Sequence, residues 1–419
     1  MIRILDIGES EVLLARRRLR LRRAEKIVAP ILEAVRRRGD AALYRCARRW
    51  DGLGGRNLVV EPREMQEAFA GLSREFRAAL AAACGNIRRF AEKQLPRERS
   101  FRAGPGIRLG QIVRPLPSVG AYVPAGRYPL PSTLLMTVVP ARVAGVPCVS
   151  AACPRPSREV LGAAHFLGMD ASPGRLFRMG GAHAIAAFAF GTATVPRVER
   201  IVGPGNIYTT AAKKLLAGEV GIDFVAGPSE IVIVADDGAD ARYLAADMLA
   251  QAEHDVHAAA ILLTRSRRLA RRVAVEIGRQ LRALPTAPVA RRALAGNGAL
   301  VVVRSWEEAV AFCNRYAPEH LSIPDASLLG GIVNAGSVFI GPYSPEAAGD
   351  YAAGPNHVLP TSGTARLRGG LSTADFVKVI AVQELTRAGL EHLAGAVTTL
   401  ARAEGLEAHA RSVEVRTRG

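Results

Sequence analysis

The stretch from Ala335 to Gly363 reads AGSVFIGPYSPEAAGDYAAGPNHVLPTSG, and the rest of the chain can be placed around it. It begins as a short apolar strand, predicted over Ser337–Ile340, and continues as a long loop rich in glycine, proline and tyrosine. A loop of this length inside a compact domain is usually functional or disordered, and its low charge argues against disorder. Several of its side chains are of types that bind metals or transfer protons: Glu346, Asp350, Asn356 and His357. We therefore predict a site loop at the carboxyl end of a strand.

From about Ile107 to Ile340, short β-rich runs alternate with helical segments. The predicted strands are Ser118–Val123, Cys148–Ala152, Val198–Val202, Ile231–Ala235, Ala259–Leu263, Leu300–Val303 and Ser337–Ile340. The predicted helices between them are Ser132–Val143, Ser157–Leu167, Ala182–Phe190, Asn206–Ala217, Asp240–Glu253, Arg267–Leu284 and Trp306–Tyr316. Nearly all-apolar strands alternating with helices indicate parallel sheets covered on both faces. The strands are too many for one sheet of usual size, so we predict an α/β fold with two Rossmann-like parallel-sheet domains.

Both Rossmann-like domains are expected to be incomplete and atypical. No GxGxxG motif follows a strand, so a dinucleotide would bind without the usual fingerprint. Ligands of open parallel sheets sit beyond the carboxyl ends of strands, where Gly203-Pro204-Gly205-Asn206 and the loop after Ser337–Ile340 are predicted to lie. Residues 1–100 and the tail from Thr373 to Arg416 are predicted to be mainly helical.

The length of 419 residues suits two or three domains, and the net charge of +18 is carried mostly by arginine. Such a surface attracts anions such as nucleic acid, acidic lipid or a phosphorylated cofactor, but it is equally compatible with an ordinary solvated arginine-rich surface. The chain shows neither zinc-finger spacing nor an aromatic RNA-binding motif. Charge alone therefore does not indicate a nucleic-acid-binding protein.

The five cysteines are scattered, odd in number and without a CxxC pair. This pattern argues against a disulfide framework and a thiolate zinc site, and favours buried thiols in a reducing compartment. The first residues, MIRILDIGES, do not resemble a signal peptide, and Pro140 and Arg142 interrupt the longest apolar run. We expect a cytoplasmic protein.

Two short motifs could carry chemistry. In LAQAEHD, Gln251 and His254 are three residues apart on one helical face and could share a metal ion with a carboxylate and a second histidine, although such a pair is often structural. In APEHL, Glu319 and His320 follow a helix and enter a strand. A fixed imidazole can accept a proton and an adjacent carboxylate can activate water. A charged turn on the surface could have the same sequence.

Two further pairs are weaker by themselves. Asp350 and His357 could be a metal ligand and its hydrogen-bond partner, or could merely line the loop. Glu404 and His409 lie in AEGLEAHARSVEVR near the C-terminus, where a histidine is usually solvated.

Taken together, these segments resemble the histidinol dehydrogenases. The resemblance rests on QAEHD, APEHL, GPYSPEAAGDYAAGPNHVLPTSG and AEGLEAHARSVEVR, with AGPSE, GPGN and RGDAAL in support, and it runs from about residue 24 to 416. It implies a dehydrogenase that oxidises L-histidinol to L-histidine in the last steps of histidine biosynthesis. Two NAD-dependent hydride transfers proceed through an aldehyde kept on the enzyme.

The resemblance also implies one Zn²⁺ per subunit, which orients the substrate by binding its nitrogen atoms. The implied metal ligands are Gln251, His254, Asp350 and His409. The last of these comes from the partner subunit of an intertwined homodimer, and neither nucleic acid nor membrane is implied as a partner.

By the same resemblance, His320 is the general base and Glu319 activates water on the aldehyde. The implied substrate-binding residues are Ser229, Gln251, His254, His320, Asp350, His357, Glu404 and His409. The cofactor-contacting positions are Tyr122 in GAYVPAG, Asn206 in GPGN and His183 in GGAHAIA. The family usually has Gln where this chain has His183, and imidazole can still donate a hydrogen bond.

These implications suggest domain boundaries. Residues 21–121 and 230–370 form the first Rossmann-like domain, with the metal and catalytic loops, and residues 122–229 form the second, on the NAD side. Residues 1–20 are a small N-terminal appendage, and residues 371–419 a helical C-terminal tail that reaches the partner subunit.

Two other functions stay open at this point. Arg127 and Tyr128 in YVPAGRYPLPST differ from the smaller residues that are usual in the biosynthetic enzymes, and resemble paralogues that oxidise other small alcohols such as sulfonated diols. Activity with an anionic diol and none with histidinol would favour such a paralogue. A salt-sensitive complex with duplex DNA would instead favour nucleic-acid binding.

Overall fold

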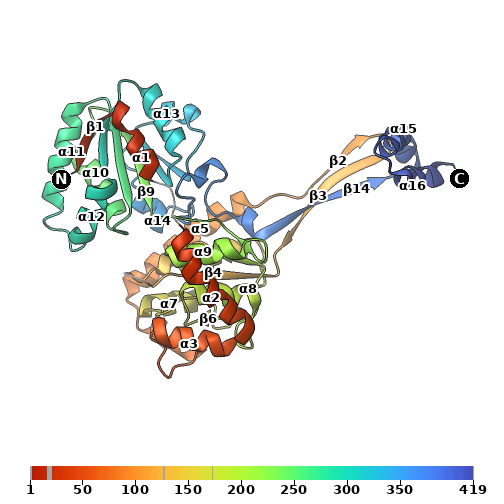
Figure 1. Ribbon diagram of the computed structural model, residues 1–419, viewed down its shortest axis with the longest axis horizontal. Helices are drawn as coiled ribbons and strands as arrows, with labels where there is room; N and C mark the ends of the chain where they lie inside the picture. The colour runs from red at the N-terminus through yellow and green to blue at the C-terminus, as the bar shows by residue number, and fades with distance from the viewer. Residues whose placement is uncertain (1, 17–20, 126–127, 172, 419) are drawn as a thin grey trace.

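The computed structural model of the chain describes residues 2–16, 21–125, 128–171 and 173–418. Figure 1 shows two lobes, each built around a sheet, and a long arm that leads away from them to the C-terminus. Both lobe sheets are parallel throughout and flanked by helices, which confirms the predicted α/β fold. Among the described residues, no helix has the length and apolar character needed to span a bilayer.

The larger sheet has six strands in the order β1-β11-β10-β9-β12-β13. Their bounds are β1 Arg3–Asp6, β9 Glu230–Ala235, β10 Ala259–Thr264, β11 Ala299–Val302, β12 His320–Ile323 and β13 Ser337–Ile340. The central strand β9 is buried along its whole length, and its side chains alternate between two apolar clusters. One cluster contains α10 Ala241–Ala252, α11 Arg267–Gln280 and α12 Ala287–Asn297, and the other contains α1 Glu11–Arg16 and α13 Trp306–Tyr316. Apolar strands covered on both faces are expected in a parallel sheet.

The smaller sheet has five strands in the order β6-β5-β4-β7-β8. Their bounds are β4 Ser118–Tyr122, β5 Cys148–Ala152, β6 Leu176–Phe177, β7 Arg200–Val202 and β8 Gly221–Ile222. One apolar cluster contains α4 Pro62–Ala70, α5 Arg74–Gln94, α6 Pro131–Val143 and α7 Arg158–Phe166. A second contains α2 Arg22–Arg38, α3 Asp40–Trp50, α8 Gly181–Phe190 and α9 Ile207–Leu216.

The chain is grouped differently from the boundaries expected from its sequence. Strand β1 forms an edge of the larger sheet instead of belonging to a separate appendage. Helices α2 and α3 pack against α8 and α9 of the smaller lobe, although residues 21–121 were expected to join the larger sheet. These contacts join segments far apart in the sequence, and no local pattern encodes them.

The arm is a three-stranded antiparallel sheet in the order β14-β3-β2. It consists of β2 Arg99–Gly104, β3 Ile107–Pro115 and β14 Val377–Leu385, and it carries α15 Arg387–Ala403 and α16 Glu407–Thr417 at its tip (Figure 1). The prediction of a helical tail is correct for α15 and α16 and wrong for β14. Apolar residues of β14 occur at Val379, Ile380, Val382 and Leu385, so they do not alternate, and each is exposed. Without a buried face the strand lacks the periodicity that predicts one.

Candidate active site

The predicted catalytic pair lies at the amino end of the larger sheet. His320 is the first residue of β12 and pairs in register with Ile231 of β9. The loop after Ile340 does leave β13 at its carboxyl end, as predicted. Helix α14, Glu346–Tyr351, then brings Asp350 against His320. The expectation that the site lies beyond the carboxyl ends of these strands is therefore wrong, because the loop folds back to the opposite edge.

His320 and Glu319 are almost completely buried, with 2% and 6% of their surface exposed. His320 Nε2 lies 3.2 Å from Asp350 Oδ1, and its Nδ1 lies 3.2 Å from the carbonyl oxygen of Glu230 and 3.6 Å from Glu319 Oε2. Glu319 Oε2 accepts a hydrogen bond of 2.7 Å from the backbone N–H of Glu230. The imidazole is thus held in one orientation from both sides.

The surroundings change the basicity of both groups. Burial raises the pKa of Glu319 to about 8, although the neighbouring His320 opposes the shift. Burial alone would lower the pKa of His320, but the carboxylates of Glu319 and Asp350 outweigh it and raise that pKa to about 10. A buried imidazole stabilised by two carboxylates is a stronger base than one in water. Such shifted pKa values are typical of groups that transfer protons.

His357 links the two lobes. Its Nδ1 lies 2.7 Å from the carbonyl oxygen of Asp350, and its Nε2 lies 3.3 Å from Thr133 Oγ1 in the first turn of α6. The neighbouring Asn356 donates from Nδ2 to the carbonyl of Met136, also in α6, at 2.6 Å. Because α6 follows β4 in the chain, this loop sets the catalytic edge of the larger sheet against the carboxyl edge of the smaller one.

Gln251 and His254 lie at the end of α10. Gln251 is fully buried, and with its amide oriented to satisfy its neighbours it donates to Glu346 at 2.7 Å and accepts from the N–H of Glu230 at 3.0 Å. The ring of His254 is accessible to solvent, yet desolvation by surrounding protein lowers its pKa, against the opposing charge of Asp350. An amide, a neutral imidazole and a carboxylate are donors that suit Zn²⁺.

The chain by itself does not complete the predicted metal site. Within the described ranges, no group of three or more His, Cys, Asp or Glu residues is arranged to hold a metal ion. Glu404 follows α15 and His409 lies on α16, both exposed, and Figure 1 shows these helices at the tip of the arm, away from α10 and α14. The structure therefore brings Gln251, His254 and Asp350 to one region and leaves Glu404 and His409 outside it.

The predicted cofactor side lies at the carboxyl edge of the smaller sheet. Tyr122 ends β4, and its hydroxyl accepts a hydrogen bond of 3.0 Å from the N–H of Gly181. Asn206 caps α9, with Oδ1 accepting two backbone N–H groups at 3.0 and 3.1 Å. Before it, Gly203 has a φ of +111°, and a Cβ there would lie 2.3 Å from the carbonyl oxygen of Tyr122, so only glycine fits. Backbone N–H groups at the starts of helices on such an edge suit a pyrophosphate.

The structure places the other predicted residues less centrally. His183 lies in the first turn of α8, but its ring is 2% exposed and packs against Asp51 and Trp50. Ser229 is half-buried directly before β9. Arg127 lies outside the described residues, and the hydroxyl of Tyr128 donates a long hydrogen bond of 3.5 Å to the carbonyl of Glu253.

Three further residues complete this geometry, and only Glu346 among them was expected from the sequence, as part of the site loop. Glu346 accepts from the Gln251 amide, Glu230 contacts both Glu319 and His320, and Thr133 meets His357. A signal was present for Glu230, because it directly follows Ser229. Thr133 had no signal, since its contact joins residues far apart in the chain.

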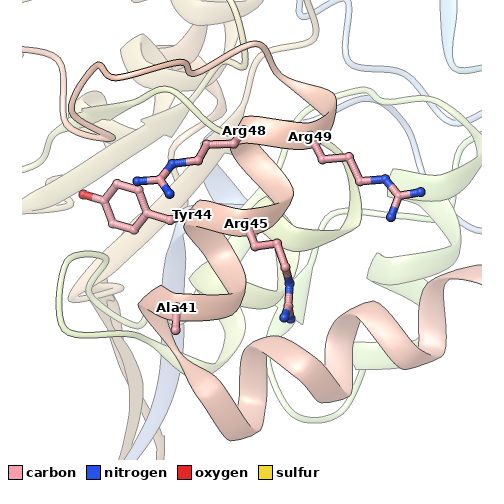
Figure 2. Close-up of a pocket in the computed structure, with 5 residues that line it drawn as sticks. All are labelled: Ala41, Tyr44, Arg45, Arg48 and Arg49. Carbon is pink, nitrogen blue, oxygen red and sulfur yellow. The ribbon is translucent and has the colours of Figure 1, made fainter.

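An open hollow on α3 has a different character. It is lined by Ala41, Tyr44, Arg45, Arg48 and Arg49. Figure 2 shows that the three arginine side chains point in different directions instead of converging on one point. The hollow also offers no acid or base for proton transfer, so it does not compete with the site at His320.

The ionisation of Asp247 on α10 provides a test of the burial near this site. Burial raises its pKa from 3.8 to about 6, so the folded state binds the proton more tightly than the unfolded chain, and stability falls as the pH rises from about 4 to about 6. We expect Asp247→Asn to raise the free energy of unfolding by up to about 3 kcal/mol at pH 8 and by roughly half as much at pH 5. Urea unfolding of both proteins at the two pH values measures this. An equal gain in the free energy of unfolding at both pH values would show that the ionisation of Asp247 does not destabilise the fold.

Known proteins resemble this chain over nearly its whole length. The sequence profile described as histidinol dehydrogenase matches residues 14–417. The histidinol dehydrogenase of Thermus thermophilus is 52% identical over 396 residues, covering 94% of each chain. That of Geobacter metallireducens is 48% identical over 421 residues, covering 98% of this chain and 96% of the other.

A solved structure extends the likeness from sequence to fold. The crystal structure of histidinol dehydrogenase from Elizabethkingia anophelis superposes with a TM-score of 0.90 at 35% identity, covering 94% of this chain and 92% of that one. The match spans both lobes and the greater part of the chain, so it is not confined to a shared sheet architecture. On its profile, its relatives and its fold, this chain belongs to the histidinol dehydrogenase family.

Proposed function

We propose that this chain oxidises L-histidinol to L-histidine through enzyme-held histidinal, using two NAD and one Zn²⁺ per subunit. The observation that carries the proposal is the buried Glu319–His320 pair, with Asp350, Gln251 and His254 in the same region. The His357 contact sets this region against the carboxyl edge of the smaller sheet. An acid–base pair beside a dinucleotide-binding edge suits a dehydrogenase.

Gln251, His254 and Asp350 would hold the zinc ion together with His409 of the partner subunit. The donor set fits, because it combines amide and carboxylate oxygens with imidazole nitrogens. When bound, Zn²⁺ supplies a positive template for the nitrogen atoms of the substrate. Glu346 and the backbone N–H of Glu230 fix the Gln251 amide between them, as surrounding groups commonly do for metal ligands.

In the first oxidation, the neutral form of His320, whose share increases as the pH rises, accepts the hydroxyl proton of histidinol while the carbon-bound hydrogen leaves as hydride. NAD supplies the hydride acceptor. Asp350 lies beside Nε2 of the ring and the carbonyl of Glu230 beside Nδ1, so each ring nitrogen has a fixed partner. The carboxylates that raise the pKa of His320 also stabilise the imidazolium that forms.

In the second oxidation, Glu319 takes a proton from a water molecule that adds to the aldehyde carbon of histidinal. The hydrate formed carries the hydrogen that leaves as the second hydride, and loss of its two hydroxyl protons yields the carboxylate of histidine. Glu319 is buried and its pKa is raised, so this side chain can accept and release a proton near neutral pH. Ser229 and His357 would contact the substrate, with Glu404 of the partner subunit.

The cofactor would bind along the carboxyl edge of the smaller sheet. Tyr122 presents its phenol there, and the first turn of α9 behind Asn206 offers backbone N–H groups to the pyrophosphate. The arm with α15 and α16 would cross to the second subunit of a homodimer and complete the site with Glu404 and His409. This arrangement accounts for an arm whose strand β14 is largely exposed in the single chain.

The test is NADH formation from L-histidinol by zinc-loaded protein, counted against substrate consumed. We expect two NADH per histidinol, loss of activity with a chelator and recovery with Zn²⁺. One NADH per substrate would contradict the second oxidation. No NADH from histidinol, with NADH from a sulfonated diol, would replace this function by that of a paralogue, and the segment around Tyr128 would then be the first place to examine.

A further inference from the structure

A buried pair of side chains, Asp51 and His183, joins α3 to the glycine turn that begins α8. Asp51, directly after α3, is 5% exposed, and His183 is 2% exposed. Asp51 Oδ2 lies 2.7 Å from His183 Nε2 and also accepts a hydrogen bond of 2.9 Å from the backbone N–H of Gly180. One carboxylate oxygen therefore fixes both the start of α8 and a side chain of its first turn.

The turn held in this way leads directly to Tyr122. Gly180 is the N-cap of α8, and the next residue, Gly181, has a φ of +54° and donates its N–H to the Tyr122 hydroxyl at 3.0 Å. A Cβ on Gly180 would lie 2.7 Å from Pro154 and 3.2 Å from Asp51 Oδ1. The turn is thus packed so tightly that a shift of Asp51 moves Gly181, and with it the phenol at the end of β4.

The burial of His183 argues against direct contact with a ligand. Its ring packs against Trp50, with centroids 5.8 Å apart, and Nε2 is engaged by Asp51. The carboxylate of Asp51 also lies at the N-terminus of α8, where it offsets part of the positive potential of the helix dipole. A cofactor pyrophosphate therefore gains more from the N-terminus of α9 than from that of α8.

We propose that Asp51 and His183 are positioning residues for NAD, which set the α8 turn and the Tyr122 phenol and do not touch the cofactor. The inference rests on the proposed function, because it requires NAD to bind at this edge. It differs from a direct His183 contact in one respect. A positioning role also acts through the N–H of Gly180, so Asp51→Asn should still weaken NAD binding in a His183→Ala protein, whereas under a direct contact Asp51 acts only through His183.

The deciding variant is Asp51→Asn, which keeps the size of the side chain and removes the charge that strengthens both hydrogen bonds. We expect its NAD dissociation constant, measured by calorimetry on the zinc-loaded protein, to rise about tenfold, which corresponds to about 1.4 kcal/mol. The KM for NAD should rise in parallel, while kcat and the KM for histidinol stay within about twofold. His183→Ala should weaken NAD binding similarly, and His183→Gln should restore most of it, because its amide can still donate to Asp51.

A second pair in the same lobe supplies the matched control. His165 Nδ1 lies 2.9 Å from Asp170 Oδ2, but this pair lies at the end of α7, where Asp170 also accepts a hydrogen bond from Gln66. We expect His165→Ala to leave NAD affinity unchanged. If the natural chain binds no NAD, the proposed function fails. If it binds NAD and Asp51→Asn binds equally well, or if Asp51→Asn raises both KM values together, the positioning role is overturned.

Discussion

Replacing His320 with alanine is expected to lower kcat by about 10³, the usual contribution of a general base, while one zinc ion per subunit remains bound. The imidazole is buried and held by Asp350 on one side and the carbonyl of Glu230 on the other, where it can accept a proton from the substrate. Its removal takes away that acceptor but none of the proposed metal ligands. Steady-state kinetics and zinc analysis on the same sample measure the two effects separately.

His254→Ala should behave in the opposite way. This side chain is a proposed metal ligand at the end of α10, so its loss should weaken zinc binding by about 10- to 100-fold or more, and turnover should fall with zinc occupancy. Added Zn²⁺ should restore part of the activity of this variant and none of that of His320→Ala. His257→Ala is the matched control, because His257 is an exposed histidine of the same loop. Equal zinc loss in the His320 and His254 variants would contradict the division of roles.

Mixing two inactive variants is expected to restore activity. In the proposed homodimer, each site takes His254 from one chain and His409 from the other, because His409 lies on the arm, away from α10 of its own chain (Figure 1). With no more than one Zn²⁺ supplied per subunit, the His254→Ala and His409→Ala homodimers should both be almost inactive. A hybrid dimer of the two contains one site with both changes and one intact site. Random exchange of subunits should therefore restore about a quarter of the natural activity.

The experiment requires that subunits exchange, so the two chains are best unfolded together and refolded with Zn²⁺. The control mixes His254→Ala with Asp350→Ala. These residues would serve the site from the same chain, so each site of the hybrid retains one change and no activity should return. Recovery in the control, or none in the first mixture, would contradict a site shared between subunits. Sedimentation of the mixtures verifies that dimers have formed.

Much of the core could be predicted because it follows local patterns. The strands Ser118–Tyr122, Cys148–Ala152 and Ser337–Ile340 and the helix Trp306–Tyr316 have an apolar periodicity that marks them without tertiary information. The strands of the arm could not be found in this way. β14 exposes apolar side chains on both faces, and its pairing with β3 joins residues more than 200 positions apart, from Val377 with Pro115 to Leu385 with Ile107.

The same contrast holds for the candidate site. Glu319, His320, Gln251, His254 and Asp350 were identified because unusual residue types stand in recognisable motifs. Their edge of the sheet was placed wrongly, since a loop leaving the carboxyl end of β13 can fold back to either edge. Glu230, Thr133 and Asp51 were not identified as parts of the site, because their roles depend on contacts with residues of other segments.

By itself, the sequence determined the α/β class, the two parallel sheets, the family and the residue types of the catalytic pair, because each follows from periodicity or from motifs within short segments. Only the tertiary structure decided that α2 and α3 cover the smaller sheet, that the catalytic pair is buried against Asp350, and that His183 faces Asp51. Only the tertiary structure showed that His409 lies far from the other predicted metal ligands of the same chain. Burial, pKa shifts and the division of a site between chains depend on contacts between distant segments, which no local pattern encodes.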